Sequence, residues 1–436
     1  MSKLAIVLAG GVVLAGASVA TLAFDRSSPT PKVAVVAPID NRPPSYVPRI
    51  LTEPSGVDVA TEQRAFDEAA RSAWAFIEAG HIAGTGLTVA QTTWAYPTVW
   101  DIASTLAAYY AGRGLGFISE DEYRRRTLRA LQTLERARLY NNVAYGRNYD
   151  AKTGDLVGHD QKPSINGTGY SAIDLGRLLV WLKIVSQDNP ELAAAAQRVA
   201  GRINASHVVR NGYMHGETVA KDASVAKYQE GRLGYEQYAA HGFQLWGMKA
   251  DRAARAAHNA RKVVVQGLPM TADRRKLDRI TSEPFILHGL EIGLDGEMKE
   301  MAWQTLAQQA QRYSKTGIMT MASEDALNVK PYYFYYYCVY CSGKEFVINV
   351  HSPGTDLDEP RWLSTKAAFA WHALLPSKYT WSAIDAVRPA HVPGKGWASG
   401  VFEKSGKSTE VLSLNTAAVI LEAALYRKTG KPFLKS

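Results

Sequence analysis

Acidic residues recur in the first turns of helices that the sequence predicts. Asp101 lies in the stretch PTVWDIAS and Asp174 in GYSAIDLGR, while Glu236 and Glu283 begin two further helices. The N-terminal dipole stabilises a carboxylate in a first turn by about 0.3–1 kcal/mol, which explains each acid taken alone. Helices with parallel axes would bring all four acids to one rim, and the dipole does not require that arrangement. We therefore expect at least two of them to bind a ligand or to catalyse a reaction.

Paired carboxyl groups carry out glycoside hydrolysis. The two groups stand roughly 6.5–9.5 Å apart in an inverting enzyme and about 5–5.5 Å apart in a retaining one. The proton donor needs a raised pKa, so its carboxyl group must be partly desolvated. Glu236, which stands between Tyr235 and Tyr238, is the predicted donor. Asp101 and Asp174 have more polar neighbours and are predicted to stay ionised, which completes a predicted catalytic set of three.

Basic and aromatic residues would complete such a site. Arg177 follows Asp174 by three positions, so it would lie near that acid on the helix and either hold its charge or bind the substrate. Aromatic rings stack on the apolar faces of sugars, and the aromatic residues at the same end of the predicted helices are Trp94, Tyr96, Trp100, Tyr170, Tyr235 and Tyr332–Tyr337. A long link adds Glu324 and Asp325. The predicted substrate-binding residues are Arg177, Glu324, Trp100, Tyr235, Tyr170 and Glu283.

The elements that must position these residues are almost all helices. Capping residues and the spacing of apolar residues predict twelve of them, and sustained two-residue alternation occurs only around 332–350. Several begin with clear signals, such as Ser119 at the head of SEDE and Asn189 before Pro190. The predicted ranges are 62–79, 98–112, 119–137, 171–186, 190–205, 234–249, 251–262, 283–293, 296–313, 364–376, 378–388 and 414–428.

Long and short links alternate between these helices. Short links favour antiparallel neighbours, whereas long loops in a compact domain tend to be functional. The pattern predicts an all-α (α/α)6 toroid, with long loops at one end and a small β-hairpin insertion. The inner helices would start near residues 98, 171, 234, 283, 364 and 414, with their N-termini at one rim.

The N-terminal part of the chain predicts export. An uncharged run from Leu4 to Phe24 is long enough to span a bilayer and could also be a cleaved signal. We therefore assign 1–26 to a signal-anchor or signal peptide, 27–56 to a Pro-rich linker and 57–436 to the helical domain. The expected location is the periplasm, with the protein anchored in the inner membrane or secreted across it.

Composition excludes some classes of partner. The net charge of +9 is modest for 436 residues, and Lys and Arg are scattered, so no nucleic-acid partner is expected. The two cysteines, Cys338 and Cys341, are too few for a structural zinc site. In an oxidising compartment they favour a local disulfide, with free thiols as the alternative. The sequence predicts no metal and no cofactor, and it leaves the oligomeric state open.

Several stretches occur in a characteristic order: YPTVWDIAS, GYSAIDLGRLL, GYEQYAAHGFQLWG, ASED…PYYFYYY, LSTKAAFAWHALLPSKY and NTAAVILEAALY. In these the chain resembles a bacterial domain family of unknown function, number 3131, over roughly residues 60–432. That family is similar to the glucoamylase-like and endo-β-1,2-glucanase (α/α)6 hydrolases, which implies a glucan-type substrate. The resemblance implies that Glu236 takes the position of the general acid. It implies that Asp174 is a base or a substrate-binding carboxylate.

The sequence leaves three candidate functions open. The first is a membrane-tethered periplasmic glycoside hydrolase or transglycosylase acting on an envelope or exported polysaccharide. The second is a non-catalytic carbohydrate-binding or scaffold protein of polysaccharide secretion. The third is a polysaccharide lyase, which would use Tyr or His as the base on an acidic sugar, with His241 and His351 as the candidate histidines. Loss of function on mutation of Glu236 would separate the first from the second.

Overall fold

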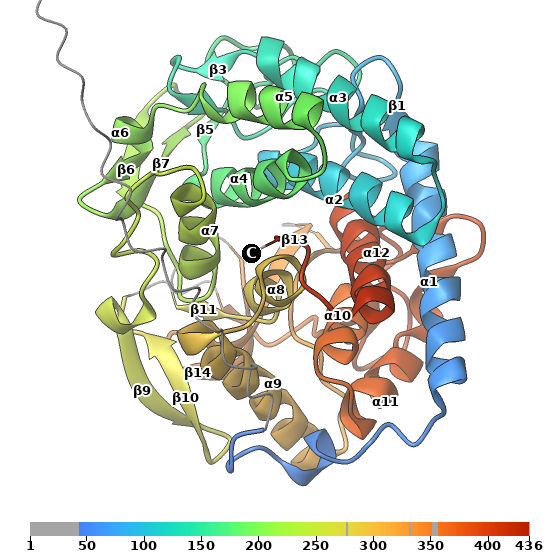
Figure 1. The fold of residues 1–436 in the computed structure, drawn as a ribbon. Helices are drawn as coiled ribbons and strands as arrows, with labels where there is room; N and C mark the ends of the chain where they lie inside the picture. The colour runs from blue at the N-terminus through green and yellow to red at the C-terminus, as the bar shows by residue number, and fades with distance from the viewer. Residues whose placement is uncertain (1–42, 276–277, 331–332, 351–355, 436) are drawn as a thin grey trace, which may run out of the picture. The chain divides into compact units, whose positions relative to one another are not determined.

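Six helices pack on one another as a central set, and Figure 1 shows them around the centre of the fold. The computed structural model describes residues 43–435, except 276–277, 331–332 and 351–355. The central helices are α2 (Val99–Leu115), α4 (Ala172–Ser186), α7 (Tyr235–Gln244), α8 (Glu283–Leu287), α10 (Thr365–Leu374) and α12 (Leu414–Thr429). Packing contacts join each of them to the next, and α12 also packs on α2.

Five further helices lie outside the central six (Figure 1). They are α1 (Val59–Gly80), α3 (Glu120–Arg136), α5 (Pro190–Ala200), α9 (Gly296–Thr316) and α11 (Lys378–Ala386). They pack on α12, α2, α4, α8 and α10, respectively. The fold is therefore helix-rich and consistent with the (α/α)6 type that the alternating links predict.

Caps fix the starts of the central helices. Each of the six begins within one residue of its predicted start, and Thr98, Ser171 and Ser413 each accept a hydrogen bond from a backbone N–H of the helix that follows. Glycine sets the approach of α4 to α7, because a Cβ on Gly176 or Gly242 would collide with the facing helix. The cap and the close packing together fix the first turn of α4, which carries Asp174.

The prediction of a helix over 251–262 is wrong. The segment contains a short 3-10 helix, η2 (Ala256–His258), and then β9 (Ala260–Val265), which pairs with β10 (Leu268–Asp273). Gln266 and Gly267 connect the two strands with positive φ angles of 51° and 85°. A two-residue turn of this kind suits a hairpin, and the β-branched run before it favours a strand.

The fourth central helix is also shorter than the predicted 283–293. After α8 the backbone continues as a π-helical turn, η3 (His288–Ile292). That turn places Glu291 in the buried interior between the central helices. The segment therefore keeps its position in the fold while its hydrogen-bond pattern changes after one turn.

Strands occupy the long links, and there are more of them than the single insertion expected. The hairpin predicted around 332–350 is confirmed as β13 (Phe334–Cys341) and β14 (Lys344–Asn349), joined by β11 (Arg279–Ile280), β12 (Glu324–Ala326) and β15 (Asp356–Leu357) in one antiparallel sheet. A second sheet contains β5 (Gly169–Tyr170), β6 (Val209–Arg210), β7 (Tyr213–Val219) and β8 (Val225–Gln229).

Short elements complete the links. The remaining pairs of strands are β1 (His81–Ile82) with β2 (Leu87–Thr88), β3 (Leu139–Tyr140) with β4 (Ala144–Tyr145), β16 (Trp362–Ser364) with β19 (Gly400–Phe402), and β17 (His391–Val392) with β18 (Gly396–Trp397). The short helices are η1 (Arg49–Leu51), α6 (Ala205–Val208) and η4 (Arg388–Ala390).

Residues 43–56, which the sequence analysis places in a linker, pack on the helices. Leu51 is buried, the Tyr46 hydroxyl donates to Glu300 of α9 at 3.1 Å, and the Glu53 carbonyl accepts from the first residue of α11 at 2.9 Å. The boundary expected at residue 57 therefore falls inside a packed segment. No helix among the described residues is long and apolar enough to cross a membrane, and the predicted segment Leu4–Phe24 lies outside them.

The two cysteines do not form the expected disulfide. Cys338 and Cys341 are free thiols, both buried in β13 and packed with Val347. Burial raises the pKa of the Cys338 thiol well above its usual range, so this thiol stays protonated.

Candidate active site

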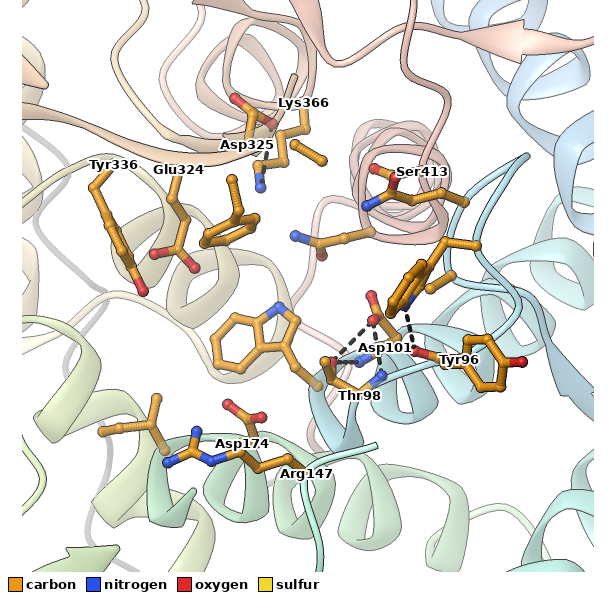
Figure 2. Close-up of a pocket in the computed structure, with 18 of the residues that line it drawn as sticks. Tyr96, Thr98, Asp101, Arg147, Asp174, Glu324, Asp325, Tyr336, Lys366 and Ser413 are labelled. Carbon is orange, nitrogen blue, oxygen red and sulfur yellow. Dashed lines mark hydrogen bonds and ion pairs between the residues drawn. The ribbon is translucent and has the colours of Figure 1, made fainter. Parts of the chain in front are cut away.

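A cavity of about 310 Å3 lies where the first turns of the central helices meet β12 and β13 (Figure 2). Four carboxylates line it, those of Asp101, Asp174, Glu324 and Asp325, together with the cations of Arg147, Arg232 and Lys366. The aromatic residues in its wall are Trp94, Tyr96, Trp100, Tyr235, Phe334 and Tyr336. Figure 2 shows Asp174 and Arg147 entering from one side and Glu324 and Asp325 from the opposite side.

Asp101 both caps its helix and lines the cavity. Its Oδ2 accepts hydrogen bonds from the backbone N–H of Thr98 at 3.0 Å and from the Thr98 hydroxyl at 2.9 Å. Burial raises the pKa of Asp101, while the Thr98 bonds and the charges of Arg177 and Lys366 act in the opposite direction. One carboxylate oxygen of Asp101 therefore caps the start of α2, and the same side chain also lines the cavity.

Asp174 stands at the start of α4 beside a cation that the sequence analysis did not identify. The Ser171 hydroxyl donates to Asp174 Oδ1 at 3.1 Å. Burial and the nearby charge of Glu230 raise the pKa of Asp174 to about 7, and Arg147 opposes that shift. The expected partner was Arg177, so the structure replaces it with Arg147 from the long link before α4.

Glu324 enters the cavity from β12, opposite Asp174. Pairing of β12 with β13 sets Glu324 across from Tyr336. The Glu324 side chain is 8% exposed, and its Oε2 has no hydrogen-bond partner among the described residues. Burial and the charge of Glu283 raise its pKa to about 7, against the opposing charges of Arg232 and Lys366. These conditions favour a carboxyl group that keeps its proton near neutral pH.

Lys366 connects the acids at the back of the cavity. Its Nζ lies 2.7 Å from Glu283 Oε2 and 3.4 Å from Asp325 Oδ1. Asn415 Nδ2 donates to the other oxygen of Glu283 at 2.6 Å. Glu283 is therefore fully buried behind the wall and is not itself among the residues that line the cavity, although it was predicted to bind substrate.

Aromatic rings and one guanidinium form part of the wall. The Arg232 guanidinium lies 4.8 Å from the ring centre of Tyr235 and 4.8 Å from that of Tyr336. Trp100 lies 5.9 Å from Tyr235, ring centre to ring centre. Trp100 and Tyr235, both predicted to bind substrate, line the cavity. Tyr170 is buried against Tyr140 outside the cavity, and Tyr332 lies outside the described residues.

Glu236 does not line the cavity, contrary to its expected position. Its buried carboxylate accepts hydrogen bonds from Arg275 at 2.7 Å and from Gln229 at 2.9 Å, and Arg275 also binds the buried Asp273. Burial raises the pKa of Glu236, and Arg275 opposes the shift. Successive residues point about 100° apart around a helix, so Tyr235 faces the cavity while Glu236 faces the Arg275 cluster.

Arg177 lies in the interior rather than beside Asp174. It donates to the Ser104 hydroxyl and to Asn415 Oδ1, both at 2.9 Å, and lies 3.5 Å from Glu291 and 3.4 Å from Glu422. It contacts the cavity wall through Asn415 and through the Trp100 ring, which is 4.7 Å from its guanidinium. Arg177 therefore supports the wall, and its predicted contact with substrate is not seen.

The lyase alternative loses one of its two candidate histidines. His241 packs against His288, away from the residues that line the cavity. His351 lies outside the described residues. Among those residues, no group of three or more His, Cys, Asp or Glu side chains is arranged to hold a metal ion.

Sequence reasoning missed four residues of this wall, namely Arg147, Arg232, Lys366 and Asn415. Lys366 and Asn415 stand second in their helices, as Glu236 does, so a search of first turns for any polar residue would have found both. Arg147 and Arg232 lie in links, where nothing in the sequence marked them.

Comparison with known proteins identifies the family. A search of curated proteins finds no match to this sequence. Three solved structures of similar fold are a candidate glucoamylase from Bacteroides fragilis NCTC 9343, endo-β-1,2-glucanase from Chitinophaga pinensis in complex with sophorotriose and glucose, and endo-β-1,2-glucanase from Talaromyces funiculosus in complex with sophorose.

The similarity to these structures lies in the fold. The TM-scores are 0.62, 0.62 and 0.57, with sequence identities of 13%, 13% and 10%. The alignments cover 87%, 84% and 84% of this chain and 94%, 93% and 84% of those chains. The family model for the protein of unknown function DUF3131 matches residues 68–430. The chain therefore belongs to the DUF3131 family.

Proposed function

We propose that the protein is a glycoside hydrolase or transglycosylase that acts on a glucan-type polysaccharide at this cavity. The observation that carries the proposal is a pair of carboxyl groups, Asp174 and Glu324, that enter one cavity from opposite sides with pKa values of about 7. Similar folds in endo-β-1,2-glucanases bound to sophorose and sophorotriose support a glucan as the substrate. The packing of α12 on α2 supports a closed (α/α)6 ring around the site.

In this proposal Glu324 is the general acid. Its desolvated carboxyl group retains a proton near neutral pH and can donate it to the glycosidic oxygen as the bond breaks. Asp174 acts on the opposite side of the sugar, as the base for water or as the nucleophile. Asp101 remains an anion that stabilises the positive charge developing on the ring. Glu236 is not assigned to the reaction, because its carboxylate is bound by Arg275 outside the cavity.

A mutant series on a panel of glucans tests these roles. Reducing ends and product sizes are measured for the wild type and for Glu324→Gln, Asp174→Asn and Glu236→Gln. Glu324→Gln should reduce kcat by 10²–10⁴-fold, the usual contribution of general acid catalysis, while oligosaccharide binding remains. Glu236→Gln is the matched control and should keep most of the wild-type kcat. If Glu236→Gln lost its activity and Glu324→Gln kept it, Glu236 would be the acid. Binding without turnover of any glucan would identify a carbohydrate-binding protein.

We also propose that the protein acts in the periplasm, tethered to the inner membrane through Leu4–Phe24 or released after cleavage there. The uncharged run of that segment supports export. A reporter fused after residue 60 should be active only outside the cytoplasm. Activity confined to the cytoplasm would contradict the proposal.

A further inference from the structure

A second hollow opens beside the cavity and has a different chemistry. Its volume is about 630 Å3, and it is lined by Gln91, by 93–94, by 327–328, by 333–334 and by Val411. It shares Gln91, Trp94 and Phe334 with the carboxylate cavity, so the two spaces adjoin. The carboxylate cavity is at the small end of the range of about 300–1,000 Å3 for ligand sites, so an oligosaccharide bound there must extend into neighbouring space.

Exposed aromatic side chains gather in this hollow. Among the described residues they are Trp94, Tyr333 and Phe334, which are 39%, 49% and 37% exposed, and all three line it. Solvent-exposed rings that cluster in one concave surface mark a binding site rather than a core. The Trp94 ring is held in place, because its Nε1 donates to the Tyr96 carbonyl at 3.2 Å and its backbone exchanges hydrogen bonds with Gln91.

The rest of the lining selects against a charged ligand. Its polar side chains are Gln91, Thr93 and Asn328, and none of the described residues that line the hollow is ionised at neutral pH. Asn328 is fixed by a hydrogen bond to Glu410 at 2.8 Å. Neutral donors and acceptors beside aromatic faces match a sugar ring, which has apolar C–H faces and a rim of hydroxyl groups.

We propose that this hollow is an outer subsite that binds uncharged sugar units of the same chain whose glycosidic bond lies among the carboxylates. This inference rests on the proposed function, because it takes its substrate, a glucan, from there. It adds that recognition depends on chain length. A short oligosaccharide fills the carboxylate cavity alone, whereas a longer one also stacks on Tyr333 and Phe334.

The substitution Tyr333→Asn removes one ring of the hollow with little backbone strain. Tyr333 has a φ of 57°, in the left-handed region, where asparagine is better tolerated than most residues. Tyr333 does not line the carboxylate cavity, so the variant leaves the proposed machinery intact. Val264→Ser is the matched control, because Val264 is an exposed apolar side chain on the β9–β10 hairpin, away from both spaces.

The experiment uses the full chain and uncharged glucan oligosaccharides of two to eight units in the β-1,2, β-1,3, β-1,4 and α-1,4 linkages. Affinity is measured by calorimetry in a Glu324→Gln background, and kcat/KM is measured with Glu324 present. For at least one linkage, affinity should rise with length. Tyr333→Asn should lower the affinity for the long oligosaccharides by about 2- to 10-fold, as expected for one stacked ring, and leave the shortest unchanged.

The two proposals can fail separately. Length-dependent binding that needs Tyr333, without turnover by the wild type, would support the subsite and contradict the hydrolase. Turnover that is independent of length and of Tyr333 would support the hydrolase and overturn the subsite. The subsite is also overturned if Tyr333→Asn weakens short and long chains equally, if no linkage shows a gain with length, or if an acidic uronate oligomer binds as well as the neutral one through the same ring.

Discussion

The raised pKa values of Asp174 and Glu324 have different local causes. For Asp174 the causes are burial and Glu230, and for Glu324 they are burial and Glu283. Each carboxyl group therefore has a neighbouring carboxylate on its own side of the cavity, and each is also close to a cation. Both pKa values are therefore raised to about 7, so each carboxyl group can exchange a proton near neutral pH.

The proposed roles predict a narrow pH optimum near 7. Glu324 must hold a proton to act as the acid, so kcat should fall as the pH rises through about 7. Asp174 must have lost its proton to act as the base, so kcat should also fall as the pH decreases through about 7. A profile of kcat from pH 4 to pH 10 on the best glucan measures both limbs. A flat profile over this range, or an optimum below pH 5, would contradict the assignment.

At the scale of elements, Lys366 links three segments that are far apart in the sequence. It stands in the first turn of α10 and contacts Glu283 of α8 and Asp325 of β12. The lysine side chain is 2% exposed, and both carboxylates are buried. Removal of one partner from such a cluster leaves uncompensated charge in the interior, which costs more than the intact pair contributes.

We expect Lys366→Met to destabilise the fold by about 3–5 kcal/mol, because Glu283 and Asp325 would lose their shared cation. Urea unfolding at pH 7 measures the change. Lys404→Met is the control, since Lys404 is 75% exposed and its ion pair with Glu359 should contribute less than about 1 kcal/mol. Equal effects of the two substitutions would contradict the structural role of Lys366.

Local signals in the sequence predicted most of the elements. Caps such as Thr98 and Ser171 act within a few residues, so the helix starts that they mark could be found without any tertiary information. A helix was wrongly predicted over 251–262 because the charged start of this segment suits a helix, whereas the turn at Gln266–Gly267 makes its last residues part of a hairpin. The wall positions of Arg147 and Arg232 depend on how long links fold back over the cavity, which is a tertiary property.

The positions of the predicted site residues depend both on where the helices start and on how each helix is rotated. Parallel helices with acids in their first turns do bring Asp101 and Asp174 to one cavity. The sequence could not show the rotation of each helix about its own axis, and that rotation directs Glu236 towards Arg275 instead. Helix starts thus predict which residues lie at the rim, whereas helix packing determines which of these residues face the cavity.

At the scale of the whole molecule, the segment 43–56 belongs to the folded unit. Leu51 is 5% exposed, and its neighbours bind α9 and α11. We expect Leu51→Ala to destabilise the protein by about 2–5 kcal/mol in urea unfolding, with kcat of the folded fraction unchanged. The control is Val59→Ala, since Val59 is 76% exposed and its truncation should stay within about 0.5 kcal/mol. If Leu51→Ala lowered the free energy of unfolding by less than about 1 kcal/mol, the segment 43–56 would be a linker rather than part of the folded unit.

The packing of α12 on helices that are synthesised earlier affects how the chain folds during synthesis. This helix packs on α1, α2 and α10, and Ser104 of α2 donates a hydrogen bond to Asn415 across 311 positions of sequence. During synthesis the apolar sides of α1, α2 and α10 stay without this partner until α12 has been made. Contacts of such long range form late, because a large loop must close first. Cooperative folding of these helices is therefore not completed before α12 has been synthesised.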